Sequence, residues 1–148
     1  MIQINKELST AKKASLQSAK LLIKQKKLVN DVISDEGRDI KLQADIESEN
    51  IIKKYIKENS DLPILAEESG ANENLGSSFW VVDPLDGTSN YSRDFPICCI
   101  SIALIHENKI ILGVINDFNR NIIFEGSTET PAMMNSKPIS VSDISDKT

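Results

Sequence analysis

The spacing of apolar residues changes part-way along this chain, and that change constrains the fold more than any other feature. From about Gln3 to Lys26 small and apolar residues recur at helical spacing, with lysines between them, at Ile4, Leu8, Ala11, Ser15, Ala19 and Leu22. From Ile97 onward, apolar runs of strand length alternate with short polar turns. The chain therefore begins with a helix and ends as a β-meander.

A second helix is predicted from Ala44 to Glu58, with an inner stripe of Ile51, Ile52, Tyr55 and Ile56. Asp45 would lie at its start, where a carboxylate both caps the helix and stabilises its dipole, and Ser34–Arg38 is predicted as a polar loop. Strands are predicted at Pro63–Ala66, Phe79–Val82, Ile97–Ile105, Lys109–Asn116 and Ile122–Phe124. This order predicts an α+β fold in which two N-terminal helices pack on a mainly antiparallel sheet.

Length and composition exclude several classes of protein. The 148 residues correspond to one domain, and 40% hydrophobic with 26% charged residues is typical of a globular chain. The net charge of -5 argues against a nucleic-acid polymer as partner, because such a surface should be basic. The chain lacks an apolar run of the roughly 18–20 residues that a membrane span needs, and its N-terminus turns polar at once. We therefore expect no membrane partner.

The two cysteines are neighbours in a predicted strand, where successive side chains point to opposite faces. A disulfide between Cys98 and Cys99 would be strained, and together with His106 they supply too few ligands for a zinc site. The simplest interpretation is two small buried side chains in a reducing cytoplasm.

The segment from Trp80 to Tyr91 is the most informative for chemistry. A buried strand delivers Asp83 to its carboxyl end, and Asp86 follows three residues later on the expected same side. Gly87 allows a tight turn, Thr88 supplies a hydroxyl, and a helix starting there would offer free N–H groups to an anion. Because the adjoining residues include no Lys or Arg, a hard divalent cation such as Mg²⁺ would relieve the repulsion between the acids.

Two other interpretations of the same residues stay open at this point. Asp-Pro-x-Asp-Gly is also a good turn sequence, and a calcium loop is a weaker rival because the alternating ligand spacing is missing. A second acidic element, Glu67-Glu68, also ends a short apolar strand. Two neighbouring strands that both end in acids would bring them together at one sheet edge, which favours a shared metal site.

The segment from Trp80 to Tyr91 resembles the signature of the inositol monophosphatase family, in which an apolar residue precedes Asp-Pro-(Ile/Leu)-Asp-Gly-Thr. Other segments follow the order of that family, with Lys41-Leu42-Gln43 as a mild departure: Asp39–Asp45, Ala66–Ser69, Phe95-Pro96, Ser101–Leu104, Gly113–Ile115 and Asn135–Ile139.

The resemblance implies a set of site residues. Mg²⁺ ligands would be the side chains of Glu67, Asp83 and Asp86 and the backbone carbonyl of Leu85, while Gly87 and Thr88 would form the phosphate-binding turn. Thr88, with Asp45, would orient the attacking water, and Glu67 counts with them as catalytic.

The resemblance also implies that residues 1–148 form an N-terminal metal- and phosphate-binding lobe, with a second lobe absent. We expect Mg²⁺-dependent hydrolysis of a small phosphorylated metabolite, in a cytoplasmic homodimer, with little activity from these residues alone. The alternative is a non-catalytic paralogue that binds metal or a partner subunit.

Overall fold

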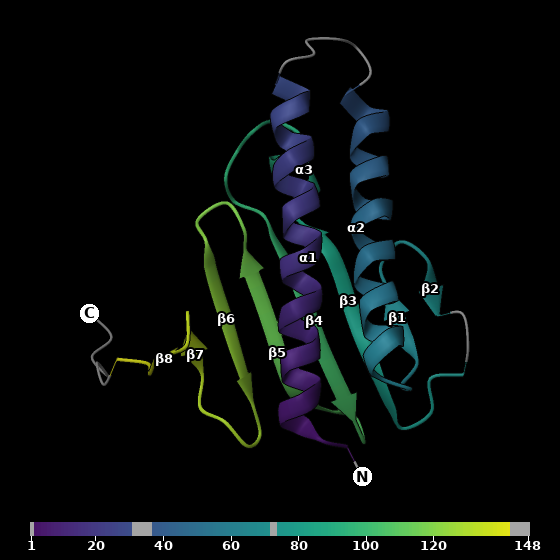
Figure 1. Cartoon of the computed structure of the whole chain (residues 1–148), viewed down its shortest axis with the longest axis vertical. Coiled ribbons are helices and arrows are strands. Elements are labelled where there is room, and N and C mark those ends of the chain that lie inside the picture. Colours follow the sequence, from purple (N-terminus) through teal and green to yellow (C-terminus); the bar gives the residue numbers. More distant parts are fainter. Residues whose placement is uncertain (1, 31–36, 72–73, 143–148) are drawn as a thin grey trace, which may run out of the picture.

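The computed structural model describes residues 2–30, 37–71 and 74–142, without the side chains of residues 27–30 and 37–42. Two long helices, α1 (Ile4–Asn30) and α2 (Gly37–Asn59), run antiparallel along one face of a single sheet (Figure 1). The predicted α+β fold, with two N-terminal helices on a mainly antiparallel sheet, is confirmed.

The sheet has eight strands in the order β2-β1-β3-β4-β5-β6-β7-β8. Their bounds are β1 Ile64–Ala66, β2 Gly70–Ala71, β3 Ser78–Asp86, β4 Cys99–His106, β5 Lys109–Asp117, β6 Ile122–Ser127, β7 Met133–Met134 and β8 Lys137–Pro138, with the short helix α3 (Thr88–Tyr91) between β3 and β4. Neighbouring strands are antiparallel except β1 and β3, which pair in parallel with Ala66 opposite Val82.

Both helices extend beyond their predicted ends, and one correction matters for the site. Helix α1 runs to Asn30 rather than Lys26, and α2 begins at Gly37 rather than Ala44. Gly37 and Arg38, predicted in a loop, are therefore helical, while residues 31–36 lie outside the described part. Asp45 is consequently not a helix cap, and that prediction was wrong. Arg, Lys, Leu and Gln in this stretch are good helix formers, and their propensity extends the helix.

The hydrophobic core lies between the two helices and the sheet. Its largest fully buried side chains include Trp80, Leu22, Ile52, Ile56, Ile100, Ile102, Leu104, Leu112 and Val114. Of the stripe predicted on α2, Ile52 and Ile56 are fully buried, and Ile51 and Tyr55 are partly buried. Alternate residues of β4 and β5 face the helices, as the period of a strand requires.

A small polar layer crosses this core. Asn116 on β5 donates from Nδ2 to Ser15 Oγ on α1, at 3.3 Å. Ser48 on α2 hydrogen bonds to Ser18 on α1 and donates to the Pro84 carbonyl, at 2.8 Å. These short side chains let the two helices approach closely, and they tie both helices to the end of β3.

The cysteines are both free, but only Cys99 belongs to a strand, because β4 begins there. Cys98 is buried and Cys99 is partly buried. Burial raises the pKa of both thiols, and in Cys99 the nearby Asp86 raises it further, to about 12. Among the described residues, no helix is long and apolar enough to cross a membrane.

Candidate active site

The parallel pairing of β1 and β3 brings the predicted acids together. Glu67 directly follows β1 and donates its backbone N–H to the Val82 carbonyl, at 3.1 Å. The next residue along β3 is Asp83, whose carboxyl group lies within hydrogen-bonding reach of the Glu67 carboxyl group. The structure therefore places Glu67 and Asp83 side by side, near the carboxyl ends of two neighbouring strands, as predicted.

A bulge at the end of β3 carries the other candidate ligands. Asp83 pairs with Ser101 and Asp86 with Cys99, so the register against β4 shifts between them. Asp83 Oδ1 accepts the Leu85 N–H at 3.1 Å, which closes a tight turn. Asp86 is exposed, with its Oδ2 3.7 Å from the Cys99 Sγ.

The crowding of negative charge changes the protonation of this site. The pKa of Asp83 is raised from 3.8 to about 7, first by burial, then by the shared hydrogen bond with Glu67 and its charge, and also by Asp86. The Leu85 N–H opposes this rise in pKa. Burial, Glu67 and Glu49 raise the pKa of Glu68. Near neutral pH one proton is thus held between carboxylates, in a place that a cation could take.

Gly87 makes the turn that follows, and no other residue fits its position. Its φ is +86°, in the left-handed region, and an added Cβ would lie 2.8 Å from the Ile97 carbonyl oxygen and 3.2 Å from the Cys98 Cα. Gly87 is the N-cap of α3, which begins at Thr88.

Thr88 connects the turn to α2. Its Oγ1 lies 3.0 Å from the Leu85 carbonyl oxygen and 3.5 Å from the Asp45 Oδ1. Asp45, on the second helix, is only 4% exposed, and its Oδ1 faces Thr88 at the start of α3. Asp45 and Thr88 were predicted to belong to one site although they lie far apart in the sequence. The structure brings their side chains within 3.5 Å of each other. The side chains of Asp39, Lys41 and Leu42 lie outside the described part of the chain.

Sequence reasoning missed Glu49, a buried residue that fixes the acidic turn after β1. The Glu49 side chain is almost fully buried, and its Oε2 accepts the backbone N–H of Glu68 at 2.9 Å. Lys53 pairs with the Glu49 Oε1 at 3.4 Å and donates to the Ser69 Oγ at 2.7 Å. The spacing of four residues from Asp45 to Glu49 to Lys53 places all three on one helix face, and that signal was available in the sequence.

The donor set suits a hard cation, although the side chains are not closed around one. Carboxylate and carbonyl oxygens are the ligands that Mg²⁺ prefers. Residues 2–30, 37–71 and 74–142, however, contain no group of three or more His, Cys, Asp or Glu side chains that could hold a metal ion. Glu67 and Asp83 form a close pair, and exposed Asp86 stands beside them.

Comparison with known proteins assigns the chain to a family. The model of the inositol monophosphatase family matches residues 3–148. The chain belongs to the inositol monophosphatase family. The resemblance of the Trp80–Tyr91 segment and its flanking segments to this family is thereby confirmed.

Individual members of the inositol monophosphatase family match over most of this chain. It is 39% identical over 114 residues to the inositol-1-monophosphatase of Synechocystis sp., covering 74% of this chain and 40% of that protein. It is 40% identical over 116 residues to the Nus factor SuhB of Xylella fastidiosa, covering 78% and 42%. The solved inositol monophosphatase of Anabaena (Nostoc) sp. PCC 7120 superposes with a TM-score of 0.82 at 33% identity, covering 98% and 53%. The chain thus spans about half or less of each relative's length.

Proposed function

We propose that this chain supplies the metal- and phosphate-binding residues of an Mg²⁺-dependent phosphomonoesterase. The observation that carries the proposal is the Glu67–Asp83 pair, in which burial first and then the neighbouring Glu67 raise the pKa of Asp83 to about 7. Two carboxyl groups that share a proton at neutral pH are prepared to exchange it for a cation. Membership of the inositol monophosphatase family supports the same class of reaction.

In this proposal Glu67, Asp83, Asp86 and the Leu85 carbonyl hold Mg²⁺. Asp86 is exposed, and its charge acts on Asp83, so in this proposal its side chain joins Glu67 and Asp83 when the ion binds. When bound, Mg²⁺ would activate water by lowering its pKa and would screen the charge of a phosphate. Gly87 and Thr88 would present their backbone N–H groups to that phosphate.

The Thr88 hydroxyl takes the role of orienting the attacking water. It donates its proton toward the Leu85 carbonyl or Asp45, at 3.0 and 3.5 Å, which leaves its oxygen lone pairs to accept a hydrogen bond from water. Asp45, buried behind it, is placed to stabilise the proton that moves away from the water. Glu67 contributes as a ligand next to the reacting water.

The substrate in this proposal is a small phosphorylated metabolite. The name of the Synechocystis relative makes inositol monophosphate the first candidate. Histidinol phosphate, 3′-phosphoadenosine 5′-phosphate and a sugar bisphosphate complete the panel that should be compared. We also propose a cytoplasmic location, which suits two free thiols.

The decisive experiment measures phosphate release with and without Mg²⁺ across the four substrates. It should use both this chain and, if the reading frame continues past Thr148, the longer product. The Asp83→Asn variant should lose Mg²⁺-dependent release, whereas Asp61→Asn, a matched change at an exposed aspartate, should not. Full activity in Asp83→Asn would overturn the assignment of metal ligands.

A subunit-pairing role without catalysis is the second candidate. On the sheet face away from the helices, Ile110, Ile115 and Phe124 are 67%, 46% and 36% exposed, and such apolar patches mark interfaces. We propose a second copy as the partner, and the Xylella relative's name, Nus factor SuhB, keeps a non-catalytic role open. Analytical ultracentrifugation tests this candidate. It would be favoured by a dimer that Ile115→Glu weakens, together with no phosphate release from either this chain or the longer product.

A further inference from the structure

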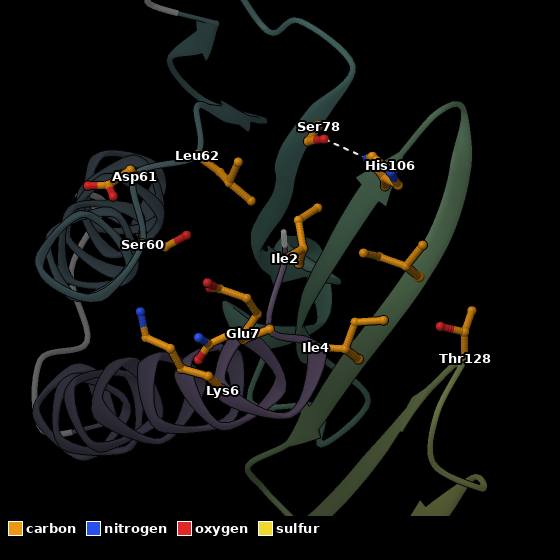
Figure 2. A pocket seen from close by; sticks show the side chains of 12 residues that line it. Ile2, Ile4, Lys6, Glu7, Ser60, Asp61, Leu62, Ser78, His106 and Thr128 are labelled. Carbon is orange, nitrogen blue, oxygen red and sulfur yellow. Dashed lines mark hydrogen bonds between the residues drawn. The ribbon is translucent and has the colours of Figure 1, made fainter.

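A second candidate site is a pocket at the amino end of β3, away from Glu67, Asp83 and Asp86. A pocket of about 720 Å³ opens between the start of α1, the segment that follows α2, and strands β3, β4 and β5 (Figure 2). Its walls are largely apolar, with Ile2, Ile4, Leu62 and Ile111 among the lining residues. A pocket of this volume holds much more than one water molecule, which occupies about 30 Å³ in the liquid.

One buried carboxylate oxygen in this pocket has no partner. Glu7, in the first turn of α1, is only 7% exposed, and its Oε2 makes no hydrogen bond. None of the ion pairs between described residues involves Glu7. Figure 2 shows its side chain reaching from α1 toward Ser60. A buried carboxylate without a partner is costly, so this oxygen is a strong acceptor that an incoming donor would satisfy.

Several other polar groups of the pocket already have partners. Ser78 Oγ and His106 Nδ1 hydrogen bond to each other at 2.7 Å, and Ser60 Oγ accepts the Trp80 indole N–H at 3.2 Å. Lys6 and Asp61, both exposed, carry opposite charges. Together with Glu7 their formal charges sum to -1, which favours a cation in the pocket.

We propose that this pocket binds a small organic cation of the primary alkylammonium class, with its charged head on Glu7 and its alkyl chain against the isoleucines and Leu62. A metal ion fits less well, because one buried carboxylate between apolar walls cannot replace a hydration shell. The charged N–H group supplies both a donor and the opposite charge, and the alkyl chain gains from contact with the walls. This proposal is independent of the phosphatase proposal.

The test titrates the full 148-residue chain with n-butylammonium and with n-butanol at constant ionic strength and pH 7, following side-chain methyl signals by NMR. Butylammonium should shift the methyl signals of Ile2, Ile4, Leu62 and Ile111 saturably, at least tenfold more tightly than butanol. In Glu7→Gln the affinity for butylammonium should fall at least tenfold. In Glu58→Gln, which removes the same charge from an exposed position outside the pocket, it should not change.

Three results would overturn the proposal: equal affinity for butanol, unchanged affinity in Glu7→Gln, or no saturable shift, which would mean that water alone satisfies Glu7. If Glu7→Gln does not fold, the comparison of butylammonium with butanol on the unaltered chain decides the question by itself.

Discussion

The two ends of β3 differ in how carboxylate groups are arranged around them. At the carboxyl end, Asp83 forms a close pair with Glu67, and burial, Glu67 and Asp86 together raise the pKa of Asp83. At the amino end, near Ser78, Glu7 is the buried carboxylate of a pocket that apolar side chains help to line, and the other carboxylate there, Asp61, is exposed. Several oxygens in one place favour a divalent cation, whereas one oxygen in an apolar pocket favours a singly charged head with an apolar body. How acids are grouped, more than how many there are, decides which cation a surface selects.

The largest expected effect is the selectivity of the two ends. Mg²⁺ should bind at Glu67, Asp83 and Asp86 at least 100-fold more tightly than at Glu7, a difference of about 2.8 kcal/mol at 1.4 kcal/mol per factor of ten. Backbone amide shifts during an Mg²⁺ titration should thus be confined to residues 67–68 and 83–88 and spare Ile2 and Leu62. Equal responses at both ends would remove the distinction.

Glycines at the two ends offer the next comparison. Gly87→Ala should destabilise the chain by about 3 kcal/mol, because a Cβ would lie 2.8 Å from the Ile97 carbonyl oxygen and φ is +86°. Gly76→Ala, near the pocket end, has a φ of +61° but open space around it, so only the backbone strain of about 1 kcal/mol applies. Urea unfolding measures both changes, and equal losses would show that the close approach at Gly87 has no cost of its own.

Glu49 should matter mainly for the acidic end. Glu49→Ala leaves the Glu68 N–H and Lys53 without their acceptor, at a cost of about 2 kcal/mol in the free energy of unfolding. Glu49→Gln keeps an acceptor oxygen and should lose about 1 kcal/mol. Calorimetric titration should show Mg²⁺ affinity falling more in Glu49→Ala than in Glu49→Gln, with butylammonium binding unchanged in both. Equal Mg²⁺ affinity in the two variants would show that Glu49 does not position the turn.

A pH dependence of stability is also expected, and it should be confined to the acidic end. The folded chain holds a proton on Asp83 up to about pH 7, while the unfolded chain releases it near the ordinary value of 3.8. The folded state thus binds more protons between these values, and the contribution of Asp83 to stability falls as pH rises through that window. Urea unfolding without metal should show this fall between pH 5 and pH 7 in the unaltered chain, and a shallower one in Asp83→Asn. Parallel pH profiles of the two proteins would contradict the raised pKa.

Local sequence cues predicted the acidic end well because each acid there directly follows an apolar run. Glu67 follows Ile64–Ala66 directly, as predicted, whereas β3 continues past the predicted end at Val82 and includes Asp83 within its bounds, Ser78–Asp86. The turn at Gly87 and Thr88 was equally visible, since glycine followed by a hydroxyl residue is typical of such a turn. Asp45 was assigned to the site through the family resemblance, but its position as a helix cap was wrong because α2 starts at Gly37.

What the sequence did not reveal depends on docking between distant elements. Glu49 becomes an acceptor for Glu68 only when α2 lies across the end of β1. The four-residue spacing places Glu49 on the same helix face as Asp45, but it does not predict the contact with Glu68. The Glu7 pocket draws its lining from segments as distant in sequence as Ile2 and Thr128. An acidic residue in the first turn of a helix has an ordinary explanation in the helix dipole, so Glu7 gave no reason to look further.

The parallel pair of β1 and β3 also has a consequence for the lifetime of the folded state. β1 pairs with β3 in parallel and carries Glu67 directly after its last residue, so Glu67 lies beside Asp83 only while the two strands stay paired. A cation held by both carboxyl groups would have to be released before β1 could separate from β3. Such a cation would therefore stabilise the folded state and lengthen its lifetime.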